Sequence, residues 1–378
     1  MKRQGSGLNA VRTPNDRCRN SGIKVVKKVF SVYCVPVLKL SDFQFDLPEE
    51  LIAQQPADRR DASRLMLVDR VRGSIEHLHF HNITDRIHDD DLFVLNDTRV
   101  FPARLIGKKE GGQSTIELFL LRELSPGKWE ALLKPARRVP PGSRILFGEG
   151  ELEAEVLPII DPGQKRHVRF NISEGLMEKF EELGEVPLPP YIRRPEGTTR
   201  EDRERYQTVY AAHQGSVAAP TAGLHFTPDI LGRIRNCRIT LHVGYGTFKP
   251  VTVENVADHV MDEEYFTVPE ESALLIRRRK ESGARVIAAG TTSARTLEAV
   301  AAMRGKVEPC RGKTDLFIYP GYRFRVIDGL LTNFHLPGST LLMLVSAFGG
   351  LELIREAYRQ AIDNGYRFYS YGDAMLVI

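Results

Sequence analysis

Residues that favour β-strands gather in short runs in the middle of the chain, and glycine, proline and charged residues separate these runs. Six such runs cover residues 103–107, 115–121, 129–133, 144–147, 152–157 and 167–171. Short strands at this spacing, with turn signals between them, are typical of a small barrel or sandwich. The pattern therefore predicts a six-stranded, barrel-like all-β domain.

The regions on either side of these runs combine strands with longer helices. Apolar runs at 65–68, 92–95 and 286–289 read as strands, and the helices are expected at 175–183, 201–210, 273–282 and 351–364, with a further one ending at Met303. Strands that alternate with helices indicate an α/β domain. We therefore expect an α/β catalytic domain of residues 40–101 and 173–378, into which the β-barrel domain, residues 102–172, is inserted.

Charge is distributed unevenly along the chain. Residues 1–39 carry nine basic side chains and one acidic side chain, a net charge of +8, whereas the whole chain carries +4. Residues 40–378 therefore carry −4, and overall charge gives no support for RNA binding. We expect residues 1–39 to be a disordered basic extension. Pro36 interrupts its apolar stretch, which argues against a secretory signal.

Other features of the composition exclude several classes of protein. The four cysteines lie far apart without CxxC spacing, as in reduced cytoplasmic proteins. No apolar run approaches the roughly 18 residues that span a bilayer, so no membrane association is expected. His77, His79 and His81 alternate with apolar residues. They could bind a metal, but an exposed strand face is favoured because no carboxylate or cysteine lies at ligand spacing.

Several segments crowd polar and small residues at expected strand ends, where α/β folds bind ligands. Asn96, Asp97 and Arg99 follow the strand at 92–95, although a structural turn with an ion pair explains them equally well. Tyr191 in the proline-rich loop offers a stacking face, whereas a solvent-exposed loop is the simpler alternative. Tyr206 lies on an expected helix, where core packing is an equal explanation.

The segment 218–226 lacks bulk, so a ligand could lie against its backbone. It contains Pro220, Thr221, Ala222 and Gly223, followed by His225 and Phe226. A second segment, 240–248, places His242 before Gly244, Gly246 and Thr247. It lacks the full GxGxxG dinucleotide fingerprint, and His242 could equally be a buried core histidine.

Three further segments complete the candidate chemistry. Gly290, Thr291, Thr292 and Arg295 form a strand-to-helix turn suited to an anion. Asn333 and His335 lie beside one turn that exposes backbone, and Asp373 lies beside another. The sequence contains no GxSxG, Walker A, HExxH or CxxC motif, which argues against hydrolase, P-loop and zinc chemistry.

Taken together, these segments resemble the S-adenosylmethionine:tRNA ribosyltransferase-isomerase family of queuosine biosynthesis. The resemblance extends over residues 40–378. It rests on LNDTRVFPARL (95–105), PLPPYI (187–192), YQTVYA (206–211), APTAGLHF (219–226), TLHVGYGTF (240–248), GTTSART (290–296), TNFHLPGSTLLMLVSAFGG (332–350) and YRFYSYGDAM (366–375).

The resemblance implies an activity and a fold. The ribosyl part of S-adenosylmethionine is moved to 7-aminomethyl-7-deazaguanine at the tRNA wobble position and isomerised. Epoxyqueuosine-tRNA forms, and adenine and methionine are released. The implied fold is an α/β domain with an inserted β-barrel. S-adenosylmethionine serves as co-substrate, no other cofactor and no metal are expected, and the enzyme is expected to be a cytoplasmic monomer.

Roles within the matched segments are hypotheses drawn from the chemistry. A base must remove a C5′ proton next to the sulfonium, and leaving adenine needs an acid. We expect His225 and His242 to flank the ribose and share this work, with Asp97 and Asp373 as secondary candidates. Arg99, Arg295 and Thr291 would anchor a carboxylate or phosphate. The expected substrate-binding residues are Asn96, Arg99, Tyr191, Tyr206, Pro220, Thr221, Ala222, Gly223, Phe226, Gly244, Gly246, Thr247, Glu264, Gly290, Thr291, Thr292, Arg295, Asn333 and His335.

The chain departs from the family pattern in three places. Asp262 stands where the family usually has histidine, although Glu264 still matches. The link from Ile230 to Ile239 is shorter than usual, which puts the placement of His242 in doubt. The basic extension lies outside the pattern.

Two alternative functions stay open. One is a non-catalytic RNA-binding module, and the other is a different S-adenosylmethionine-dependent RNA-modifying enzyme such as a methyltransferase.

Overall fold

The structure is a computed structural model that describes residues 38–158, 165–248 and 250–378. The predicted extension, residues 1–39, lies outside the described residues except for its last two positions. Lys39 forms an isolated antiparallel bridge with Asn255. Within the described residues, regular structure begins at this bridge.

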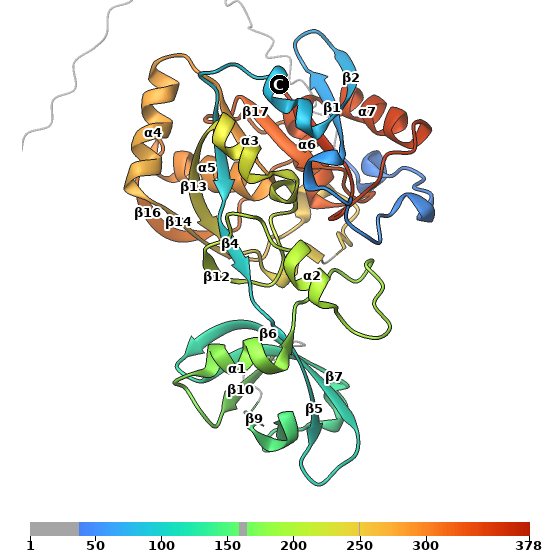
Figure 1. Cartoon of the computed structure of the whole chain (residues 1–378), viewed down its shortest axis with the longest axis vertical. Coiled ribbons are helices and arrows are strands. Elements are labelled where there is room, and N and C mark those ends of the chain that lie inside the picture. Colours follow the sequence, from blue (N-terminus) through green and yellow to red (C-terminus); the bar gives the residue numbers. More distant parts are fainter. Residues whose placement is uncertain (1–37, 159–164, 249) are drawn as a thin grey trace, which may run out of the picture. The chain divides into compact units, whose positions relative to one another are not determined.

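A nine-stranded mixed sheet forms the α/β part (Figure 1). Its order is β16-β14-β13-β3-β15-β17-β18-β1-β2. Strands β13, β3, β15 and β17 are parallel to one another, whereas β18 is antiparallel to β17 and parallel to β1. The strands are β1 Arg64–Asp69, β2 Ser74–His79, β3 Leu92–Asn96, β13 Arg235–Leu241, β14 Glu264–Val268, β15 Val286–Ala289, β16 Cys310–Thr314, β17 Gly329–Asn333 and β18 Ala374–Val377.

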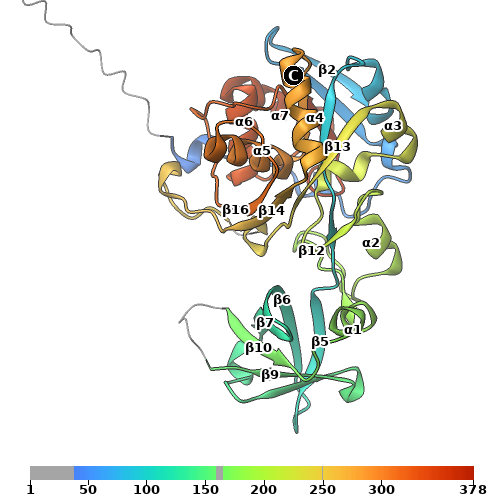
Figure 2. The ribbon, with the colours of Figure 1, turned by 90° about the vertical axis from the view of Figure 1, so that its left-hand side faces the viewer.

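Both faces of this sheet are covered, because successive side chains of a strand point to opposite faces. In β3, Val94 packs in the core under the longer helices, and its neighbour Leu95 packs with Phe226 and Ile230 on the other face. Figure 2 shows α5 and α6 on one side of the sheet and α3 on the other. The helices of this part are α2 Arg200–Arg205, α3 Pro228–Arg233, α4 Glu270–Glu281, α5 Thr291–Arg304, α6 Thr340–Gly349 and α7 Leu351–Asp363.

Nine short 3-10 helices occur in the described residues. One of them, η7, lies in the small-residue segment that the sequence singled out. They are η1 Leu40–Phe43, η2 Glu49–Leu51, η3 Arg60–Ala62, η4 Phe80–Asp85, η5 Ala136–Arg138, η6 Gly148–Gly150, η7 Thr221–His225, η8 Tyr245–Phe248 and η9 Val256–Asp258.

The predicted six-stranded barrel is confirmed. Its strands pair in the order β5-β6-β7-β10-β9-β8, and β5 pairs again with β8 to close the ring. Gly107 is required at this closure, because a Cβ there would lie 2.6 Å from the Leu146 carbonyl oxygen. The strands are β5 Arg104–Lys109, β6 Thr115–Ser125, β7 Lys128–Lys134, β8 Arg144–Phe147, β9 Leu152–Val156 and β10 Arg166–Phe170.

The segment after the barrel strands also contacts the barrel. Strand β11, Gly184–Glu185, pairs with β5, and Phe180 of helix α1, Leu176–Leu183, packs in the barrel core. The boundary of the insert at residue 172 stays a prediction, but these contacts associate residues 176–185 with the barrel. The fold class, an α/β domain with an inserted all-β domain, is confirmed.

One predicted helix is shorter than expected. Instead of continuing to Tyr210, helix α2 ends at Arg205. The reason is the side chain of Gln207, which hydrogen-bonds to both the N–H and the carbonyl of Val100 at 3.1 and 2.6 Å. Val100 belongs to β4, Thr98–Val100, which pairs with β12, His213–Ser216. Gln207 therefore fixes the turn after α2 against β4, and the chain becomes a strand only at His213.

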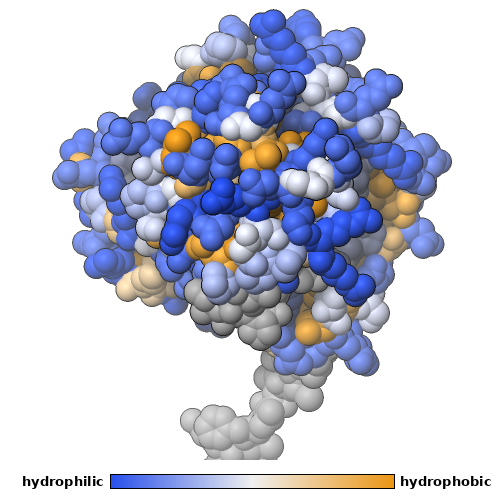
Figure 3. Space-filling view, turned by 90° about the horizontal axis from the view of Figure 1, so that it is seen from below, coloured by the Kyte–Doolittle hydropathy of each residue, from blue (hydrophilic) through white to orange (hydrophobic). Residues whose placement is uncertain are grey.

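The surface seen in Figure 3 is mostly hydrophilic. Its hydrophobic side chains are separated into small patches. Scattered apolar side chains of this kind are normal on a water-exposed face.

Candidate active site

A cavity of about 550 Å³ opens at one edge of the nine-stranded sheet. The carboxyl ends of the parallel strands β13, β15 and β17 lead into its walls through Val243, Gly290 and Asn333. This is the edge at which open α/β sheets bind ligands. The predicted site residues that line it are Tyr191, Tyr206, Pro220, Thr221, Ala222, Thr247, Gly290, Thr291, Thr292, Arg295, Asn333 and His335.

The start of helix α5 forms one wall. Gly290 has φ of 94° and ψ of 152°, a conformation that is essentially confined to glycine. Its N–H donates to the Leu331 carbonyl at 2.7 Å, which fixes the turn against β17. Thr291 and Thr292 follow as the first residues of the helix and line the cavity. The free N–H groups and the dipole of a helix N-terminus favour an anionic ligand here.

Arg295 brings a buried cation to the same wall. It forms an ion pair with Glu264, and the two side chains are only 5% and 4% exposed. The Arg295 Nε also donates to the Leu316 carbonyl at 3.0 Å, whereas its Nη2 has no partner among the described residues. Glu264 itself accepts from the Gly244 N–H at 3.0 Å and does not line the cavity. One buried donor is therefore left for a ligand.

Asn333, at the end of β17, offers an acceptor to the cavity. Its Nδ2 donates to the carbonyls of Tyr369 and Ser370 at 2.9 and 3.4 Å, which fixes the orientation of the amide. Its Oδ1 is buried and has no hydrogen-bond donor among the described residues. A buried acceptor without a donor is costly. A ligand N–H or O–H in the cavity would satisfy it.

His335 is the one histidine that lines the cavity among the described residues. Its Nε2 lies 2.8 Å from the Thr332 hydroxyl, and its backbone N–H donates to the Tyr358 hydroxyl at 3.0 Å. Burial lowers the pKa of His335 to about 3. The ring is therefore neutral at physiological pH and acts as a hydrogen-bonding group.

In the small-residue segment, residues 218–226, the first part lines the cavity and the end is buried in the core. Pro220, Thr221 and Ala222 line the cavity. Gly223 faces elsewhere, because a Cβ there would lie 2.2 Å from the Tyr210 hydroxyl. Phe226 is fully buried in the core beside α3. Thus only the first part of the segment is placed to meet a ligand.

Two of the predicted tyrosines line the cavity, together with Tyr369. The Tyr191 hydroxyl lies 2.7 Å from the Ser370 hydroxyl, and its ring lies 4.2 Å from that of Tyr369. Tyr206 is fully buried. Burial raises the pKa of both phenols, and both are therefore neutral. They supply aromatic faces.

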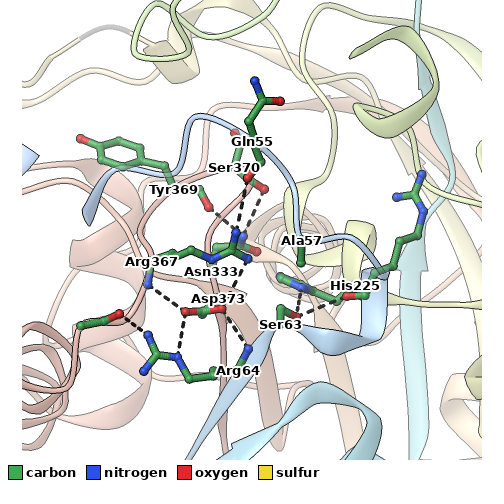
Figure 4. A network of polar contacts seen from close by, with 12 residues as sticks. Gln55, Ala57, Ser63, Arg64, His225, Asn333, Arg367, Tyr369, Ser370 and Asp373 are labelled. Carbon is green, nitrogen blue, oxygen red and sulfur yellow. Dashed lines mark hydrogen bonds and ion pairs between the residues drawn. The ribbon is translucent and has the colours of Figure 1, made fainter. Parts of the chain in front are cut away.

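His225 does not line the cavity and lies beside Ser63 (Figure 4). Its Nδ1 is 2.7 Å from the Ser63 hydroxyl, and its Nε2 has no hydrogen-bond partner among the described residues. Burial lowers the pKa of His225 to about 4, although Asp373 and the Asn333 amide raise it. Neutral His225 is a weak base at physiological pH.

Asp373 holds the chain in place beside it. Its carboxylate accepts from the backbone N–H groups of Arg64 and Arg367 at 2.9 and 2.8 Å and from the Arg64 Nε at 3.3 Å (Figure 4). Asp373 does not line the cavity. Its contacts join the start of β1 to the segment before β18.

Four predicted site residues, Asn96, Asp97, Arg99 and His242, do not line the cavity. Asn96 joins β3 to the residue that ends β13, because its Nδ2 donates to the Leu241 carbonyl at 3.0 Å and its Oδ1 accepts from the Leu241 N–H at 2.9 Å. Burial raises the pKa of Asp97, although its carboxylate accepts from the Thr240 hydroxyl at 2.7 Å. The side chain of Arg99 is exposed.

His242 is the fourth of these residues. Its Nδ1 is 2.8 Å from the Thr98 hydroxyl, and burial lowers its pKa. A Cβ on Gly215 would lie 2.9 Å from the imidazole, so the ring packs closely against that glycine. The structure does not bring His225 and His242 together in the cavity. Their shared acid/base role stays a prediction.

The Gly-x-Gly-Thr turn contributes mainly through its last residue. Thr247 lines the cavity, whereas Gly244 and Gly246 do not. A Cβ on Gly246 would lie 2.5 Å from an Asp262 carboxylate oxygen. The shortened link, Ile230 to Ile239, comprises the end of helix α3 and most of β13, and β13 still pairs in register with β3.

Several lining residues were not anticipated. Gln44, Thr332, Ser339, Tyr369 and Ser370 contribute polar atoms to the cavity. Thr332, Ser339, Tyr369 and Ser370 lie inside the quoted motifs and could have been selected. Gln44 carries no sequence signal, since only the fold brings this early residue beside Gly338.

Neither a metal site nor a membrane-spanning helix is found in the part of the chain that the structure describes. No group of three or more possible metal ligands occurs within residues 38–158, 165–248 and 250–378. His77 instead lies 2.9 Å from the Tyr366 hydroxyl, and the rings of His79 and His81 stack on each other. Over the same part of the chain, no helix has both the length and the apolar character needed to cross a bilayer.

Comparisons with known proteins agree with the sequence motifs. The family model described as queuosine biosynthesis protein matches residues 40–377. An S-adenosylmethionine:tRNA ribosyltransferase-isomerase of Caldanaerobacter subterraneus is 53% identical, covering 90% of this chain and 100% of that protein. One from Desulfitobacterium hafniense is 51% identical with the same coverage.

A solved structure is also similar. The S-adenosylmethionine tRNA ribosyltransferase of Thermotoga maritima shares 35% sequence identity and a TM-score of 0.51, covering 89% of this chain and 100% of that one. The match over nearly all of residues 40–377, at about half identity to full-length relatives, decides the family. The chain belongs to the S-adenosylmethionine:tRNA ribosyltransferase-isomerase family of queuosine biosynthesis.

Proposed function

We propose that this enzyme transfers the ribosyl part of S-adenosylmethionine to 7-aminomethyl-7-deazaguanine at the tRNA wobble position and isomerises it. Adenine and methionine leave, and epoxyqueuosine-tRNA is the product. The cavity at the sheet edge carries this proposal, because its volume of about 550 Å³ suits a ligand of nucleoside size. S-adenosylmethionine is the co-substrate, with no further cofactor, and the enzyme acts as a cytoplasmic monomer.

The polar atoms without hydrogen-bond partners indicate how S-adenosylmethionine would lie in the cavity. Its methionine carboxylate fits the start of α5, where Thr291 begins the helix and the Arg295 Nη2 is a free donor. The Asn333 Oδ1 would accept from the exocyclic amino group of adenine or from a ribose hydroxyl. The rings of Tyr191 and Tyr369 would face the sulfonium.

The proton transfers need acidic and basic side chains, and few of these line the cavity. No carboxylate of the described residues lines it, and its one described histidine, His335, has a pKa of about 3. Neutral His335 would position a substrate hydroxyl through its hydrogen bonds. His225 lies behind Asn333, and we keep it as the candidate base for the proton next to the sulfonium. Its charged form would gain from the nearby Asp373 carboxylate.

Product analysis tests the function. The enzyme is incubated with S-adenosylmethionine and precursor tRNA that carries 7-aminomethyl-7-deazaguanine, and the same tRNA with guanine at that position is the control. We expect free adenine and methionine only with the modified tRNA. S-adenosylhomocysteine would instead indicate a methyltransferase, and tight tRNA binding without turnover would indicate a binding module.

A further inference from the structure

Three arginines surround a second, much smaller pocket of about 20 Å³. Arg60 belongs to η3, Arg205 ends α2, and Arg367 lies between α7 and β18. Ser370 lines both this pocket and the large cavity, so the two are neighbours. We call Arg60, Arg205 and Arg367 the arginine pocket.

The positive charge of this pocket is poorly balanced. The Arg60 guanidinium donates to the carbonyls of Leu224 and Glu204, each at 3.1 Å, and that of Arg205 donates to the carbonyls of Ala57 and Asp58. These acceptors are uncharged. Burial lowers the pKa of Arg60, and the nearby charge of Arg205 lowers it further. The two cations therefore repel each other.

The neighbouring carboxylates have other cationic partners. Asp61 pairs through its Oδ2 with Arg59 at 3.0 Å, while its Oδ1 has no hydrogen-bond partner among the described residues, and Glu204 pairs with Arg200 at 3.3 Å. Asp373 lies 3.7 Å from Arg367, but it already accepts hydrogen bonds from Arg64. The pocket thus retains a net positive charge.

Buried polar atoms without partners line the same pocket. The Tyr371 hydroxyl and the Arg205 Nε have no hydrogen-bond partner among the described residues. Tyr371 is only 4% exposed. Groups of this kind are satisfied in most proteins by protein, water or ligand. Together with the unbalanced charge, they indicate a site for an anionic oxygen.

The size of the pocket and its place decide which oxyanion fits. About 20 Å³ holds one group of the size of water, far less than S-adenosylmethionine. A phosphodiester can insert a single charged oxygen while the rest of the strand stays outside. Arginine is well suited to that group, because its planar fork of donors matches phosphate geometry.

We propose that the arginine pocket binds a backbone phosphate of the tRNA next to the nucleotide that enters the large cavity. The inference rests on the proposed function, because it takes tRNA as the substrate. It gives the acidic body of the chain a local phosphate contact that overall charge does not predict.

The test compares Arg60→Gln and Arg205→Gln with wild type in the full-length chain. Each variant is expected to raise KM for tRNA about tenfold and to leave KM for S-adenosylmethionine unchanged. The slope of log KM against log salt concentration should fall by about 0.7–0.9 per lost phosphate contact. Arg359→Gln is the matched control, since Arg359 pairs with Glu356 and Asp363 on α7, and it should change neither constant.

A second measurement does not depend on the variants folding. Wild-type enzyme is assayed for binding to precursor tRNAs that each carry one uncharged methylphosphonate linkage in the anticodon arm. One linkage should weaken binding about tenfold. The proposal is overturned if no linkage does so, if the folded arginine variants keep the wild-type KM for tRNA, or if KM for S-adenosylmethionine rises instead. Absence of adenine release by wild type would contradict the proposed function, whereas the binding measurement would still decide the phosphate site.

Discussion

Variants of the buried ion pair Glu264–Arg295 can distinguish an effect on stability from an effect on ligand binding. Both side chains are almost completely buried, and Arg295 alone lines the cavity. Replacing Glu264 by Gln keeps the shape of the side chain but removes its charge. The Arg295 guanidinium then stays buried without a countercharge. An uncompensated buried charge of this kind costs about 3–5 kcal/mol of unfolding free energy.

Removing the second charge should restore most of this loss. In a Glu264→Gln, Arg295→Met double variant, an apolar side chain of similar length replaces the guanidinium. Replacing both partners of a buried ion pair by uncharged groups is often close to neutral. We therefore expect urea unfolding to place the double variant within about 1–2 kcal/mol of wild type, well above the Glu264→Gln single variant.

Ligand binding should not recover in the double variant. A ligand at 100 times its Kd stabilises a protein by about 2.7 kcal/mol. S-adenosylmethionine should raise the unfolding free energy of wild type by this amount and that of the double variant by far less. The reasoning is refuted if Glu264→Gln costs less than about 1 kcal/mol, or if the double variant is no more stable than the single one.

Two further predictions concern His225 and Gly290. The pKa of His225 is 6.5 unfolded and about 4 folded, so below pH 6.5 the unfolded state binds the proton first and acid destabilises the fold. Lowering the pH from 7.5 to 5 should therefore reduce the unfolding free energy by about 2 kcal/mol through this residue. Urea unfolding of wild type should show this loss, and His225→Gln should lack it. Identical pH profiles of the two proteins would contradict the prediction. Gly290→Ala places a side chain in a backbone conformation that is essentially confined to glycine. It should lower the unfolding free energy by about 1–3 kcal/mol and raise KM for S-adenosylmethionine. A variant as stable as wild type would show that alanine adopts this conformation without strain.

Local patterns were sufficient to predict the barrel and several strands and helices of the α/β domain. The barrel strands between residues 104 and 170 were found within a few residues of their bounds, because each has turn signals at both ends. The end of α2 was missed because Gln207 bonds to Val100, more than a hundred residues earlier. Such a contact leaves no mark on local periodicity.

The candidate site was predicted less evenly. Residues at strand ends, such as Gly290 and Asn333, line the cavity as expected, since parallel strands deliver their ends to one edge. Asp373 and Asn96 have the same polar character in sequence but use their hydrogen bonds to join strands. Residue type alone does not tell a ligand contact from a structural one. The arginine pocket was missed because its members come from three distant segments.

The pairing of β1 with the distant strand β18 affects the order in which the enzyme folds. Strand β1 pairs only with its hairpin partner β2 and with β18, which follows it by about three hundred residues. During synthesis, the hairpin emerges early and has no sheet to join until β18 has been made. Contacts between such distant segments form slowly, and exposed strand edges favour aggregation in the meantime. Assembly of the site wall at Ser370 should therefore be a late event in folding.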